Sequence, residues 1–97
     1  MNPKACANCP IAKTASLLSD PWTMLIIRDL LKKSMRFGEL EQSLVGISSR
    51  TLTLKLKRLE EEGILAKSNL HYALTPSGKK LKKVITAMED WGKSAGK

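Results

Sequence analysis

Two groups of residues have the types and spacing that binding chemistry requires. The first is a run from Ser48 to Arg58, rich in hydroxyl and cationic side chains that recur at helical spacing. An arginine presents a planar pair of donors that matches a guanine edge, and lysines bind phosphate. The second is the Cys-x-x-Cys pair Cys6 and Cys9, whose thiols can be oxidised or bind a metal.

The first group needs a helix that is held from its opposite side, and residues 37–62 have the pattern of a helix-turn-helix. A short connection containing Gly46 separates the two helices, and Ser48 is placed to cap the second helix by accepting a hydrogen bond from its first turn. Each helix has an apolar face for the core, formed by Phe37, Leu40 and Leu44 on the first and by Leu52, Leu56 and Leu59 on the second.

The outward face of the second helix supplies most candidates for DNA contact. Arg50 is the best base-reading candidate, Leu54 can touch a thymine methyl, and Lys57 can hold a phosphate. Charged residues opposite an apolar stripe are usually only a solvated face, but the preceding helix and the tight turn favour DNA contact. The candidates are Arg36, Ser48, Ser49, Arg50, Thr51, Thr53, Leu54, Lys57, Arg58, Lys67 and His71.

The flanking segments complete the predicted fold. Residues 64–67 and 71–74 alternate in polarity like two strands around Ser68-Asn69, so residues 64–74 are expected to form a wing. Prolines at helix-start positions predict helices over 10–18, from Pro21 to about Lys32, and over 76–92. The sequence thus predicts one domain, residues 1–97, mainly α with a small β-hairpin: a winged helix-turn-helix.

The terminal helices, 10–18 and 76–92, carry more apolar side chains than so small a domain can cover. An apolar stripe is by default core, but a homodimer is the more economical account of this excess. The predicted dimer-interface residues are Ile11, Leu18, Leu81, Val84, Ile85, Met88 and Trp91.

Composition restricts the partners and the compartment. The chain has 97 residues, a formal net charge of +8 and a sequence pI near 9.8, a balance that favours a polyanionic partner. No apolar run approaches the roughly 18 residues that span a bilayer, and the first residues lack the apolar stretch of a signal peptide. We therefore expect a cytoplasmic protein without a membrane partner and without a structural disulfide framework.

Cys9 precedes Pro10 and so takes the cap position of the first helix, where backbone amides and the helix dipole stabilise a thiolate. A lowered thiol pKa and faster oxidation are expected there, with Cys6 as the resolving thiol. A buried cap without a signalling role is the alternative. Zinc would need His71 and another ligand, and a thiol oxidoreductase would need a βαβ scaffold that this pattern lacks. We predict no enzyme activity, no metal and no cofactor.

Several segments together resemble the HxlR-type family of winged-helix transcription regulators. They are Cys9-Pro10 and residues 22–30, 36–40, 46–53, 59–63 and 72–78, and they cover nearly the whole chain. The resemblance implies a homodimeric DNA-binding regulator whose terminal helices form the dimer interface; in several members a cysteine at the position of Cys9 senses oxidants or electrophiles. The chain departs from the pattern at Asp20-Pro21, where members carry Gly-Lys or a similar pair.

The leading hypothesis is a regulator that binds double-stranded DNA at a palindromic operator. A protein–protein adaptor built on the same fold is the main alternative. An adaptor would not need Arg50, Lys57 and Arg58 on the outward face of the second helix, and its interaction would be insensitive to salt.

Overall fold

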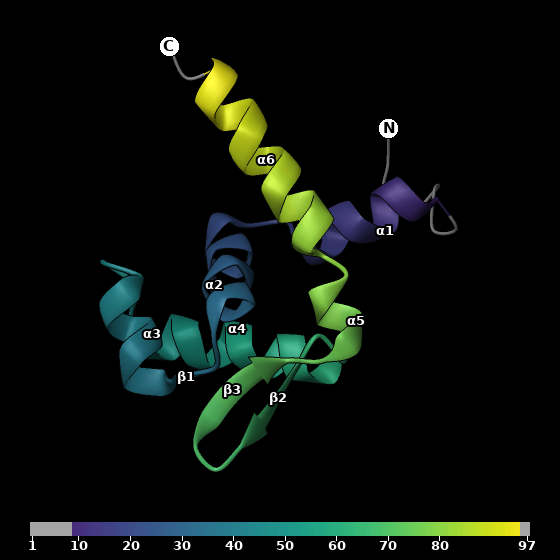
Figure 1. Cartoon of the computed structure of the whole chain (residues 1–97). Coiled ribbons are helices and arrows are strands. Elements are labelled where there is room, and N and C mark those ends of the chain that lie inside the picture. Colours follow the sequence, from purple (N-terminus) through teal and green to yellow (C-terminus); the bar gives the residue numbers. More distant parts are fainter. Residues whose placement is uncertain (1–8, 96–97) are drawn as a thin grey trace.

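The described part of the chain, residues 9–95 of a computed structural model, contains six helices and three strands (Figure 1). The helices are α1 (Pro10–Leu17), α2 (Pro21–Lys32), α3 (Phe37–Ser43), α4 (Ser49–Glu61), α5 (Pro76–Lys79) and α6 (Lys82–Ala95). The strands are β1 (Met35–Arg36), β2 (Leu65–Ser68) and β3 (His71–Leu74). The predicted fold class, mainly helical with a small antiparallel hairpin, is confirmed.

The core is built around α2, which contacts α3, α4, α6 and β3. Ile26 and Ile27 of α2 are fully buried, as the continuous apolar run in this helix requires. The predicted core face of α4 is confirmed, because Leu52, Leu56 and Leu59 are at most 1% exposed. This apolar contact fixes which face of α4 is left for a ligand.

The helix-turn-helix connection is held by local hydrogen bonds and by α2. Gly46 has φ +95°, which favours glycine, and the Ile47 amide donates to the Leu44 carbonyl at 3.0 Å. At the end of α3, the Ser43 hydroxyl donates to the buried carboxylate of Asp29 at 2.6 Å. Ser48 caps α4 as predicted, because its Oγ accepts from the Thr51 amide at 3.0 Å.

The wing differs in detail from the sequence prediction. Strand β3 lies between β2 and β1, and the short strand β1 was not predicted because its pairing depends on residues far along the chain. The turn that joins β2 to β3 is Asn69-Leu70, not Ser68-Asn69, since Ser68 pairs with His71 and both turn residues have positive φ. The prediction of the turn position was therefore wrong by one residue.

A single last helix over 76–92 was also predicted wrongly. The amides of Lys80 and Leu81 donate to carbonyls three residues back, so the α-helical ladder is interrupted between α5 and α6. A Cβ atom on Gly78 would lie 2.1 Å from the Ile64 carbonyl oxygen, which shows how closely α5 packs on the chain after α4. Leu81 can then turn toward the core before α6 begins.

The second half of α6 projects from the body of the molecule (Figure 1). Leu81 and Ile85 pack against the core, whereas Met88 is 45% and Trp91 is 73% exposed. The described helices include none that is both long and apolar enough to cross a membrane.

Candidate nucleic-acid interface

The outward face of α4 carries the candidate base-reading residues. Arg50, Thr53, Leu54 and Lys57 are all exposed, opposite the buried leucines. Among the described residues, no hydrogen bond or ion pair engages the side chains of Arg50 and Lys57. A capped helix thus presents a guanidinium and an ammonium whose donors are available to a ligand, the arrangement that base edges and phosphates require.

Three hydroxyl candidates at the start of α4 differ from its cations because their protons are engaged within the chain. Ser49 Oγ donates to Glu41 Oε2 at 2.5 Å, and Thr53 Oγ1 donates to the Ser49 carbonyl at 2.8 Å. Ser48 Oγ donates to Thr51 Oγ1 at 2.9 Å beside the helix cap. In this conformation these hydroxyls offer lone pairs to a ligand, and a base amino group is the partner that such acceptors suit.

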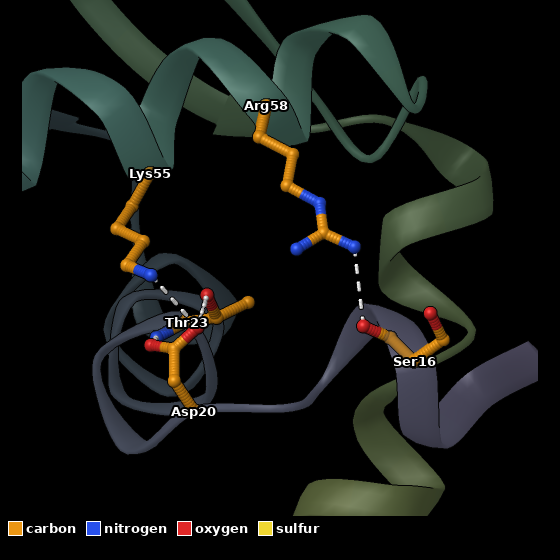
Figure 2. A network of polar contacts seen from close by, with 5 residues as sticks. All are labelled: Ser16, Asp20, Thr23, Lys55 and Arg58. Carbon is orange, nitrogen blue, oxygen red and sulfur yellow. Dashed lines mark hydrogen bonds and ion pairs between the residues drawn. The ribbon is translucent and has the colours of Figure 1, made fainter. Parts of the chain in front are cut away.

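Arg58, which was expected to contact a phosphate, is exposed, but its guanidinium makes a hydrogen bond within the chain. Its Nη2 donates to the Ser16 carbonyl of α1 at 3.1 Å (Figure 2). Lys55, which the sequence analysis did not select, reaches the same region, with its Nζ 3.0 Å from Asp20 Oδ2. Helical spacing placed Lys55 between the core face and the outward face of α4, and spacing alone does not reveal a tertiary partner.

Asp20 occupies the cap of α2 and is fixed by three donors. Its Oδ1 accepts from the Thr23 amide at 2.9 Å, and its Oδ2 accepts from the Thr23 hydroxyl at 2.9 Å and from Lys55. Burial by itself raises the pKa of Asp20, but the Thr23 amide, Lys55 and the Thr23 hydroxyl together outweigh burial and lower this pKa below its ordinary value of 3.8. The carboxylate is therefore charged at neutral pH.

The sheet brings two of the predicted contact residues together and separates a third. Arg36 of β1 pairs with His71 of β3, so their side chains emerge on the same face. Lys67 pairs with Tyr72 on the other face, and its Nζ lies 5.5 Å from the centre of the Tyr72 ring. The backbone amide of Arg36 donates to the Glu39 carboxylate at 2.9 Å, and this hydrogen bond lowers the pKa of Glu39.

Cys9 has the predicted cap position at the start of α1. Its backbone is extended, with φ −79° and ψ 122°, and its carbonyl accepts from the Lys13 amide at 3.0 Å. The sulfur makes no capping hydrogen bond, and the residue is partly exposed. Cys6 lies outside the described residues, as does its predicted role as a resolving thiol. Within residues 9–95, no three potential metal-ligating side chains come together.

An open apolar groove lies between α1, α2 and α6. Its lining includes Ile11, Leu18, Met24, Val84 and Met88, so it joins four of the predicted dimer-interface residues. Ile11 is 80% exposed, whereas Leu18 also packs against the core. The groove and the exposed end of α6 are thus one continuous apolar surface formed by the terminal helices.

Comparison with known proteins places this geometry among transcription regulators. A family model described as HxlR-like helix-turn-helix matches residues 17–97. An uncharacterized HTH-type transcriptional regulator of Synechocystis is 36% identical over an aligned length of 91 residues, and the match covers 87% of this chain and 67% of that protein. YvaP of Bacillus subtilis, also an uncharacterized HTH-type transcriptional regulator, is 35% identical over 86% of this chain and 84% of its own.

Solved structures agree with the sequence relatives. Quinone-bound YodB from B. subtilis superposes with a TM-score of 0.82 at 33% identity, covering 89% of this chain and 99% of that chain. The redox regulator HypR in its reduced form gives a TM-score of 0.81 at 27% identity, with 88% and 91% of the two chains covered. The winged-helix arrangement is therefore shared with these proteins.

Proposed function

The chain belongs to the HxlR-like helix-turn-helix family of DNA-binding transcription regulators, and on that premise we propose that it binds a palindromic operator as a homodimer, with α4 in the major groove. Arg50 reads a base edge and Lys57 binds a phosphate. Two copies related by a twofold axis present two such helices, which is why the operator is expected to be palindromic.

The exposed cationic face of α4 is the single observation that carries this proposal. Arg50 and Lys57 have no partner among the described residues, while the opposite face of the helix is fully buried. Because the backbone of the capped helix is already ordered, only these side chains must be immobilised when DNA binds. The net charge of +8 adds a long-range attraction to the phosphate backbone.

Selection of bound sequences from a random DNA pool tests the proposal. We expect a palindrome with half-site centres roughly 10 base pairs apart or a small multiple of that spacing. Arg50→Ala should cost about 1–3 kcal/mol and relax the preference at one base position, whereas Lys57→Ala should weaken all sequences evenly. If no motif is enriched and Arg50→Ala binds as the unchanged protein does, an adaptor role is indicated instead.

A sensing role of Cys9 is a second part of the proposal. Cys9 is partly exposed at the cap of α1, and structural neighbours of this chain include the redox regulator HypR. Modification of Cys9 would displace α1 within the dimer and so change the spacing of the two reading helices.

Alkylation kinetics and operator binding test this sensing role. We expect the Cys6→Ser protein, which retains Cys9, to be alkylated faster near neutral pH than the Cys9→Ser protein, which retains Cys6. Mild oxidation should change operator affinity in the unchanged protein and leave the Cys9→Ser protein unaffected. Equal alkylation rates, together with operator affinity that oxidation leaves unchanged, would reduce Cys9 to a structural cap.

A further inference from the structure

Two side chains of α4 connect this helix to the junction between α1 and α2. Lys55 reaches Asp20 at 3.0 Å, and Arg58 reaches the Ser16 carbonyl at 3.1 Å. Figure 2 shows both side chains leaving the same side of α4 and pointing toward the same short segment. The helix therefore has two sets of cations: Arg50 and Lys57, which have no partner among the described residues, and Lys55 and Arg58, which contact the α1–α2 junction.

Each of the two contacts ends on a group at the end of a helix: Asp20 at the start of α2 and the Ser16 carbonyl at the end of α1. Asp20 is fixed by the Thr23 amide and hydroxyl at the start of α2. Ser16 lies in the last turn of α1, where carbonyls lack helical amide partners and the helix dipole is negative. A guanidinium at this place caps the end of α1. A displacement of either end of the α1–α2 junction must therefore move a side chain anchored on α4.

We propose that Lys55 and Arg58 are positioning residues that couple α1 to the reading helix, and that they do not contact DNA phosphate. They hold α4 at a defined orientation to the α1–α2 junction, so that a shift of α1 changes the presentation of Arg50 and Lys57. This inference rests on the proposed reading role of α4. The two contacts physically connect the helix that Cys9 caps to the proposed DNA-binding face.

Both contacts are partly exposed, and this makes the proposal testable without loss of the fold. The Lys55 side chain is 29% exposed and Arg58 is an exposed residue. Exposed polar pairs contribute little stability, so Lys55→Gln and Arg58→Gln should each lower the melting temperature by no more than about 5 °C. The leucines that hold α4 to the core are untouched by these substitutions.

The salt dependence of DNA affinity separates positioning from phosphate contact. We would measure binding of the sequence selected by the unchanged protein over a range of salt concentrations, with Lys57→Gln as a matched lysine control on the same helix. Lys57→Gln should reduce the slope of log affinity against log salt by about 1. Lys55→Gln and Arg58→Gln should lower affinity with an unchanged slope. A slope reduced as in the control would identify Lys55 or Arg58 as a phosphate contact and overturn the proposal.

Hydrogen exchange gives a second readout that needs no DNA. In the Lys55→Gln/Arg58→Gln double variant, amides of α1 should exchange about threefold faster, because α1 loses its contact with Arg58 and the junction that follows it loses Lys55, while Lys57→Gln leaves them unchanged. Unchanged exchange in the double variant would show that α1 and α4 are not coupled through these residues. If instead exchange responds as expected but no variant affects DNA binding, the coupling holds and the reading role of α4 fails.

Discussion

At the scale of single residues, the turn of the wing contains a leucine where the backbone favours glycine. Asn69 and Leu70 have φ 52° and 68°, the pattern of a two-residue type I′ turn. Asparagine tolerates this conformation, whereas leucine is strained in it. Leu70 is also 62% exposed, so burial does not offset the strain. The turn is therefore a place where one substitution can add stability.

Leu70→Gly should raise the free energy of unfolding by about 0.5–1 kcal/mol, because glycine adopts a positive φ without a Cβ clash. Thermal unfolding measures the difference. Leu70→Ala is the matched control, since it removes the same apolar side chain but keeps the strained backbone, and it should gain less than half as much. A control that stabilises as strongly as glycine would show that the exposed side chain, and not the backbone, is unfavourable.

At the scale of helices and strands, the most informative feature is the start of α2. Asp20 caps this helix and also pairs with Lys55 of α4, so one carboxylate serves both a local and a tertiary contact. Because the pKa of Asp20 is lowered in the folded protein, the unfolded chain binds a proton more readily at this site. The contribution of the Asp20 carboxylate to the free energy of unfolding is fully present above the ordinary pKa of 3.8. It is lost as the pH falls through the lower pKa of the folded state.

Asp20→Asn tests this pH dependence, since asparagine keeps the capping ability but not the charge. The unchanged protein should be more stable than Asp20→Asn by a constant amount between pH 7 and about pH 5, and this advantage should shrink below about pH 4. Urea midpoints over a pH series measure it. In a Lys55→Gln background the shrinkage should be smaller. An advantage that persists undiminished to pH 2 would contradict the assigned ionisation.

At the scale of the whole molecule, the terminal helices leave an apolar surface that no other part of residues 9–95 covers. The groove between α1, α2 and α6 continues onto the projecting part of α6, where Met88 and Trp91 are exposed. Large apolar patches of this kind mark interaction surfaces. The homodimer that we propose would bury it and would fix the separation of the two α4 helices.

Trp91→Ala and Met88→Asp should each yield monomers in sedimentation, because removing an aromatic anchor or burying an unpaired charge costs several kcal/mol at an interface. Operator affinity should fall in parallel. Asp90→Ala, which changes the opposite side of the same helix, is the control and should stay dimeric. Dimers that persist in both variants with full DNA affinity would place the interface elsewhere.

Features that depend on neighbouring residues could be predicted from the amino-acid sequence. Helix starts at Pro10, Pro21 and Ser49 and the buried stripe of α4 agree with the structure, because caps, prolines and the 3.6-residue period act within one or two turns. The family resemblance came from the same local segments. The outward position of Arg50 also followed from the period once the core face was known.

Features that depend on distant partners became visible only in the folded chain. Strand β1 forms because β3 lies beside it, and the last helix breaks because α5 packs on the Ile64 backbone. Lys55 and Arg58 belong to α4, yet both contact the α1–α2 junction. A periodic pattern gives the direction of a side chain from its own helix, but what lies in that direction is set by how the rest of the chain packs.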